Sequence, residues 1–238
     1  MRRNERAKRS AGKAWRAVAS LAVALIFASA ELPGAGTPDW TSPWRWDAGK
    51  LTASMAGDDR IEVAFAQQGK GAFVERVIPP EIVAKSGGVI EVSLDMQVLE
   101  VDGAEQKIQV QIKPPGETAY RDEDPGYAQV RSMTGKPTAV ATLRVGEESK
   151  WDSQNVPALQ PGGNLKMVFR MDLKTGSTKI DVSSDGKEFE LSRQVSPQLE
   201  TCLSKGLVLR IKPQSEDQSL LKLSIAAGLG APAASPAE

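Results

Sequence analysis

The alternation of apolar and polar residues between Leu165 and Arg193 constrains the fold of this chain more than any other feature. Side chains alternate across a β-strand with period two. The first segment alternates apolar with mostly charged residues, and its apolar members are Leu165, Met167, Phe169 and Met171. Two more alternating segments follow, after turns at Gly176 and Asp185-Gly186. An Asp-Gly pair between such segments is a strong hairpin signal, because a type I′ turn needs positive φ. The stretch predicts an antiparallel meander with one apolar face that a second layer must cover.

Short alternating segments separated by Gly, Pro and Asp turns occupy most of residues 40–226. The longest covers residues 89–99, and the next begins after a turn at Asp102-Gly103, so these two segments are predicted to form a hairpin. Polar loops are predicted at residues 114–126 and 146–163, and a helical turn within residues 196–205. A run of about a dozen short strands predicts an all-β fold, a two-sheet antiparallel β-sandwich.

The chain contains no histidine and one cysteine, Cys202. The lack of histidine excludes Ser-His-Asp and Cys-His catalysis and histidine-bound metals. A single cysteine excludes an intrachain disulfide and a thiolate zinc cluster. We therefore interpret Cys202 as a small, half-buried hydrophobic residue.

The formal net charge of zero hides an asymmetry along the chain. Residues 1–30 hold seven of the 30 Lys and Arg and one of the 30 Asp and Glu, so the remainder carries a net charge of −6. A nucleic-acid-binding domain needs a basic surface. The acidic remainder therefore predicts no nucleic-acid partner.

The first 30 residues have the three regions of a secretory signal peptide. Met1 to Arg16 is basic, Ala17 to Ala30 is almost purely apolar, and Ala28-Ser29-Ala30 matches a cleavage pattern. The apolar run is short for a bilayer span, which takes ~20 residues, so an uncleaved membrane anchor is the alternative. We expect export to the periplasm, the cell surface or the extracellular space. Residues 31–39 are predicted to be a linker, and the Ala/Gly/Pro-rich residues 227–238 a disordered tail.

Three of the five tryptophans lie between Trp40 and Trp46. Tryptophan has a large apolar body and one hydrogen-bond donor, and it serves two purposes. The segment either forms a stacking platform for sugar rings or pins the edge of the sandwich with partly buried indoles. We favour the structural interpretation.

The order of these elements resembles the concanavalin A-like or laminin G-like jelly roll. The resemblance rests mainly on LKMVFRMDLKTG at residues 165–176 and KIDVSSDGK at residues 179–187, which are similar to paired strands of that family. It covers roughly residues 40–226. The family includes glycan-binding modules, glycoside hydrolases and adhesion domains, so it implies a fold and no single function.

An enzyme of this fold would hydrolyse a polysaccharide with two carboxylates. The strand at residues 89–99 carries Glu91 and Asp95 on one face, with Glu100 out of phase unless a bulge intervenes. Four strand residues separate the first two carboxylates by roughly 13 Å. Hydrolases hold them ~5–5.5 Å or ~6.5–9.5 Å apart. We therefore predict a solvated polar face and no enzyme.

Calcium binds carboxylate and carbonyl oxygens, which loops often provide. The predicted loop 114–126 concentrates such groups, and its candidate ligands are Asp122, Glu123 and Asp124. The run does not match an EF-hand, and a solvated acidic turn is the simpler interpretation. Calcium is thus the one cofactor that the sequence leaves open.

A glycan site would combine an exposed aromatic ring with amide and carboxylate groups. The predicted loop 146–163 contains such a set, namely Trp151, Asp152, Gln154 and Asn155. Tyr120 and Tyr127 flank the acidic loop and would join this set if the two loops meet. The alternative is that Trp151 caps an edge of the sandwich.

Together, these features predict an exported, non-catalytic binding or interaction module. Its expected partner is a glycan or another envelope protein, with membrane contact only if the N-terminal segment stays uncleaved. A glycoside hydrolase of the same fold and a structural cell-envelope protein are the alternatives.

Overall fold

A computed structural model of the chain describes residues 40–48, 51–57, 59–65, 71–116, 125–133, 135–145, 150–184, 187–194, 199–213 and 220–230. All of them lie within one compact unit, Ala35–Glu238. Within these ranges the chain forms fourteen strands and two short helices.

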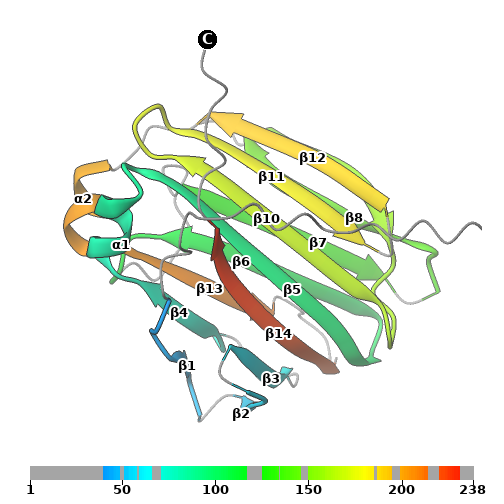
Figure 1. Cartoon of the computed structure of the whole chain (residues 1–238). Coiled ribbons are helices and arrows are strands. Elements are labelled where there is room, and N and C mark those ends of the chain that lie inside the picture. Colours follow the sequence, from blue (N-terminus) through cyan, green and yellow to red (C-terminus); the bar gives the residue numbers. More distant parts are fainter. Residues whose placement is uncertain are drawn as a thin grey trace, which may run out of the picture. The chain divides into compact units, whose positions relative to one another are not determined.

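The strands form two antiparallel sheets, which Figure 1 shows as two layers. Sheet A contains, in spatial order, β1 (Trp44–Trp46), β4 (Val74–Ile78), β13 (Leu207–Pro213), β6 (Glu105–Lys113), β7 (Gly126–Met133), β8 (Thr138–Val145) and β9 (Lys150–Pro157). Sheet B contains β12 (Lys187–Gln194), β11 (Ser177–Ser184), β10 (Asn164–Asp172), β5 (Val89–Asp102), β14 (Leu220–Gly230), β3 (Arg60–Phe65) and β2 (Thr52–Met55). The chain crosses repeatedly between the sheets, and the predicted two-sheet jelly-roll sandwich is confirmed.

The predicted meander of residues 165–193 is present as β10, β11 and β12. Phe169 lies opposite Ile180 and both are buried on the inner face, and β12 pairs with β11 in register, with Leu191 opposite Ile180. Gly176 has φ of 73°, the positive value that the turn between β10 and β11 was predicted to need. The second predicted turn, Asp185-Gly186, lies outside the described residues.

The predicted hairpin between residues 89–99 and 107–112 is wrong. β5 pairs with β10 and β14 in sheet B, whereas β6 pairs with β13 and β7 in sheet A. The turn at Asp102-Gly103 therefore carries the chain from one sheet to the other. An alternating segment buries its apolar face equally well beside its neighbour or across the core from it, so the pattern alone does not distinguish the two.

Four further elements refine the predicted boundaries or add to the predicted elements. β9 occupies part of the predicted loop 146–163, and β14 continues to Gly230, past the predicted end of the sandwich at residue 226. Helix α2 (Leu199–Lys205) confirms the helical turn, while α1 (Pro80–Lys85) was not predicted. The two helices lie side by side (Figure 1). No helix in the described part of the chain is long and apolar enough to cross a bilayer.

The inner faces of both sheets form one hydrophobic core. Its fully buried members include Leu94, Met96, Met167 and Phe169 from sheet B and Ile112 from sheet A. Each such side chain contributes about 1.5–3 kcal/mol on burial. The opposite face of each sheet, called here the outer face, carries the polar half of each alternating strand.

Candidate functional site

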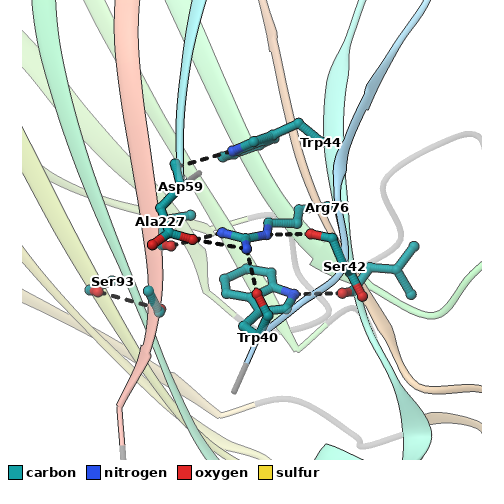
Figure 2. Close-up of polar contacts among 9 residues, drawn as sticks. Trp40, Ser42, Trp44, Asp59, Arg76, Ser93 and Ala227 are labelled. Carbon is teal, nitrogen blue, oxygen red and sulfur yellow. Dashed lines mark hydrogen bonds and ion pairs between the residues drawn. The ribbon is translucent and has the colours of Figure 1, made fainter. Parts of the chain in front are cut away.

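The tryptophan segment folds around a buried arginine. Figure 2 shows the Arg76 guanidinium between the indoles of Trp40 and Trp44, with ring centroids 4.3 and 5.9 Å from its Cζ atom. Arg76 donates hydrogen bonds to the carbonyls of Ser42 at 2.8 Å and Ala227 at 3.1 Å, so it links strand β4 of sheet A to β14 of sheet B.

The same contacts decide between the two interpretations of this segment. Trp40 is 7% exposed and Trp44 is 4% exposed, and each indole N–H donates to a backbone carbonyl, of Val77 and Asp59 respectively. Buried rings of this kind cannot stack on sugars in solvent. The structural interpretation of the segment is confirmed, and β1 is an edge strand of sheet A.

The structure describes the side chains of two of the six predicted glycan-binding residues, Asn155 and Tyr127. Trp151, Asp152 and Gln154 lie in β9, where the structure describes their backbone and not their side chains. Asn155 follows them in β9 and is exposed. Tyr127 lies in β7 and is 3% exposed, so its ring faces the protein and not solvent. Tyr120 lies outside the described residues.

The predicted calcium ligands Asp122, Glu123 and Asp124 also lie outside the described residues, so the calcium prediction stays a prediction. Within the part of the chain that the structure describes, no group of three or more Cys, Asp and Glu side chains is arranged to hold a metal ion.

The acidic residues of β5 share one face through a bulge. Lys222 of β14 pairs with Glu100, but the next residue, Leu223, pairs with Val98, so the register shifts between them. Glu100 thereby comes into phase with Glu91 and Asp95 on the outer face of sheet B. The spacing along the strand remains too wide for a pair of hydrolytic carboxylates.

A charged hollow of about 520 Å³ lies on the outer face of sheet B over β10, β11 and β12. Its polar lining consists of Lys166, Arg170, Asp181, Ser183, Glu188 and Glu190. Arg170 Nε donates to Glu91 Oε2 at 2.8 Å, and its Nη1 donates to Asp181. The hydrogen bond to Asp181, supported by that to Glu91, raises the pKa of Arg170 against the effect of partial burial. The charges of this hollow therefore largely satisfy one another.

A larger pocket, of about 720 Å³, opens where three connections meet. We call it the loop-end pocket. Its lining comes from the β5–β6 turn, the β7–β8 turn and the loop between β9 and β10. The floor is mainly apolar, with Val101, Met133 and Leu159, and Met133 is 46% exposed. A concave site with an apolar floor and a few polar groups is the usual form of a ligand pocket.

Two buried polar residues hold the walls of the loop-end pocket. Gln106 Nε2 donates to the carbonyl of Asp102 at 2.5 Å, and Ser132 Oγ accepts from the backbone N–H of Leu159 at 3.1 Å. The first bond closes the β5–β6 turn, and the second ties the end of β7 to the loop between β9 and β10. Three polar side chains at the pocket remain exposed to solvent and are available to a ligand: Asp102, Lys136 and Gln160.

Sequence reasoning missed this pocket because its residues come from three separate connections. Its only local signals were the turn at Asp102-Gly103 and the Gly135-Lys136-Pro137 turn, which predict loops without indicating that they meet. The loop that precedes β10 forms the C-terminal part of the predicted loop 146–163, whereas Trp151 lies near the N-terminal end of that prediction.

No protein-family model and no curated protein matches this sequence. Among solved structures, the chain is similar to a sialidase with 13% identity and a TM-score of 0.46, covering 79% of this chain and 17% of that one. It is also similar to peanut lectin, with 13% identity and a TM-score of 0.45 over 81% and 94% of the two chains. Lectin II from Ulex europaeus gives 11% identity and a TM-score of 0.44 over 81% and 94%. The fold class rests on the strand order of the chain itself, and no functional argument rests on these similarities.

Proposed function

We propose that this protein is an exported, non-catalytic binding module that holds a carbohydrate unit in the loop-end pocket. One observation carries the proposal, namely the pocket of about 720 Å³ that three connections build on a rigid sandwich. Loops fixed by a rigid scaffold are the usual position for binding residues. The apolar floor suits the C–H face of a sugar ring, and the exposed groups of Asp102, Lys136 and Gln160 suit its hydroxyls.

Export belongs to the proposal and is supported by the sequence of residues 1–30. The basic stretch from Met1 to Arg16 precedes an apolar run that ends in Ala28-Ser29-Ala30. A glycan partner in the cell envelope or outside the cell agrees with this location.

The alternative function, a glycoside hydrolase, finds its best support on the outer face of sheet B. Asp181 and Glu190 lie directly opposite each other in β11 and β12, and both line the charged hollow. Each has a cationic partner, however: Asp181 pairs with Arg170, and Glu190 lies 3.6 Å from Lys179 Nζ. The carboxylates of a glycoside hydrolase must face the scissile bond, whereas these two are turned toward neighbouring cations. We therefore favour binding over hydrolysis.

The test is a calorimetric titration of residues 31–238 with a panel of soluble oligosaccharides. We expect one class of sugar to bind the unaltered protein and to release no reducing ends. Ala104→Trp places an indole at the exposed rim of the pocket, and we expect it to weaken binding about tenfold or more by filling the space that the ligand needs. The matched control is Ala84→Trp, because Ala84 is an exposed alanine of helix α1 outside the pocket.

Several outcomes would overturn parts of this proposal. Equal binding by Ala104→Trp and Ala84→Trp would place the glycan elsewhere. Release of reducing ends that stops in Asp181→Asn would establish the hydrolase. If no sugar binds, the remaining alternative is that the protein has a structural role in the cell envelope. Running each titration with calcium and with EDTA tests the predicted acidic site Asp122–Asp124, because a calcium-dependent module binds its ligand only in the first condition.

A further inference from the structure

The outer face of sheet A contains polar side chains that are as buried as the core. In β6, Ile108, Val110 and Ile112 point to the core, so Gln109 and Gln111 point to the outer face. Gln109 is nevertheless 5% exposed and Gln111 is 0% exposed. A strand residue on the outer face of a two-layer sandwich normally meets water. These two glutamines are cut off from it.

Half of this cluster is connected by hydrogen bonds. Gln109 Nε2 donates to Tyr127 Oη at 2.7 Å and to Gln129 Oε1 at 3.2 Å. Tyr127 Oη lies 3.3 Å from Gln129 Oε1 and donates to it. We call Gln109, Gln111, Tyr127 and Gln129 the glutamine cluster.

Three polar atoms of the cluster have no hydrogen-bond partner. Gln109 Oε1, Gln111 Oε1 and Gln111 Nε2 are buried polar atoms without a hydrogen bond in the structure. Gln111 lies between Tyr127 in β7 and Arg210 in β13, directly opposite each. Buried polar atoms in native proteins nearly always have a partner, and a bound molecule is one way to supply it. The unmade bonds therefore mark a place where a ligand would gain hydrogen bonds without displacing existing ones.

The chemistry of the unmade bonds restricts the ligand. Two carbonyl oxygens need O–H or N–H donors, and one amide nitrogen needs an acceptor. Adjacent hydroxyl groups supply both. The described charged side chains around the cluster on this face are mainly basic, namely Lys107, Lys113, Arg131, Arg210 and Lys212. The acids are Glu75 and Glu105, which pair with Arg210 and Arg131. Glu75 already accepts two bonds from Arg210, at 3.0 and 2.7 Å.

The surroundings of the cluster also favour a negative charge. Burial, and then the nearby charge of Arg210, lower the pKa of Lys212 below that of an ordinary lysine. A carboxylate placed here would relieve the repulsion between the two cations.

We propose that the glutamine cluster is the floor of a second ligand site, separate from the loop-end pocket, which takes a small hydroxylated carboxylate such as a sugar acid. Hydroxyls of the ligand donate to Gln109 Oε1 and Gln111 Oε1, and Gln111 Nε2 donates to the ligand. The carboxylate lies toward Arg210 and Lys212. Because Gln111 has no exposed surface, binding requires a local opening of this face and is slow.

The test uses the full chain, equilibrated for hours with D-glucuronate or with D-glucose, which has the same ring hydroxyls and no carboxylate. We expect glucuronate to raise the Tm in a concentration-dependent manner and glucose to raise it far less. Gln111→Leu removes the amide at similar volume. We expect it to raise the Tm of the ligand-free protein and to weaken glucuronate binding about tenfold or more.

A second measurement needs no variant at this position. Glucuronate should shift the side-chain amide resonance of Gln111 in a ¹H–¹⁵N spectrum of the unaltered protein. Ala104→Trp, which fills the loop-end pocket, should keep the glucuronate response, so failure of the proposed function would leave this inference standing. The proposal is overturned if glucuronate leaves the Tm and the Gln111 resonance unchanged, if glucose acts equally, or if Gln111→Leu responds like the unaltered protein.

Discussion

On the outer face of sheet B, the polar side chains of the central strand β5 stay largely in solvent, whereas on the outer face of sheet A those of β6 from Gln109 to Lys113 are buried. Asp95 and Gln97 of β5 are exposed. Gln111 and Lys113 of β6 are 0% and 1% exposed. Both strands have the same alternation of apolar and polar residues, so the difference arises from what covers each face and not from the strand pattern.

The comparison separates two uses of polar residues. On sheet B, Arg170 joins Glu91 and Asp181 across three strands in solvent, where each ion pair is worth little. On sheet A, a buried polar group must find a partner or cost free energy, because water cannot solvate it. Substitutions at matched positions on the two faces should therefore differ sharply, and they test the comparison directly.

The largest difference is expected between Lys113→Ala and Lys166→Ala. Lys113 is among the largest fully buried side chains of the described residues, whereas Lys166 of β10 is exposed. Truncating a buried lysine leaves a cavity and breaks compensating interactions, which typically costs about 3 kcal/mol of unfolding free energy. Lys166→Ala should change it by about 0.5 kcal/mol or less.

Urea denaturation of the two variants gives both values, with an unchanged m-value showing that each still unfolds in two states. Similar losses in the two variants would contradict the burial of the sheet A face. They would also remove the basis for the glutamine cluster as a closed site.

The sequence predicted the strands and the two-sheet architecture better than it predicted what covers the outer face of each sheet. The meander from Leu165 to Arg193 was correct because its register depends on local alternation and on turn residues such as Gly176. The hairpin at Asp102-Gly103 was wrong because two amphipathic strands pack equally well within a sheet or across the core. The burial of Gln109 and Gln111 could not be predicted from the sequence, since nothing in an alternating strand reports what lies over its polar face.

The candidate sites were harder to predict than the fold for the same reason. The loop-end pocket needs Asp102, Ser132 and Leu159 to meet, and these residues come from three connections. Arg76 occupies an apolar phase of β4, between Val74 and Ile78, which was a visible irregularity, but its partners lie in distant segments. Tyr127 was expected to flank the acidic loop as a candidate glycan contact, and it is a buried residue of strand β7.

A smaller difference is expected between the exposed arginines of the two faces. Arg170 on sheet B has two carboxylate partners, Glu91 and Asp181, whereas Arg131 on sheet A has Glu105. Surface ion pairs contribute ~0.2–1 kcal/mol each. Arg170→Ala should therefore lower the unfolding free energy by up to about 1 kcal/mol, and Arg131→Ala by about half as much.

Repeating these urea titrations at high salt sharpens the result. Both losses should shrink, because salt screens charges in solvent. A loss for Arg170→Ala that resists salt would mean that its pairs are shielded from water, contrary to the exposed face described here.

The smallest effect concerns pH and the half-buried Lys212 of β13. Burial, followed by the charge of Arg210, lowers the pKa of Lys212 in the folded protein from the ordinary 10.5. Between the two pKa values the unfolded chain binds more protons, so the stability of the protein rises as pH rises through this window. Lys212→Gln should therefore stabilise the protein at pH 7 by at most a few tenths of a kcal/mol, after allowing for the exposed half of the side chain. That gain in unfolding free energy should fade as pH approaches 10.5. The control is Lys179→Gln, on the exposed face of sheet B. An equal dependence of its unfolding free energy on pH would contradict the contrast between the two faces.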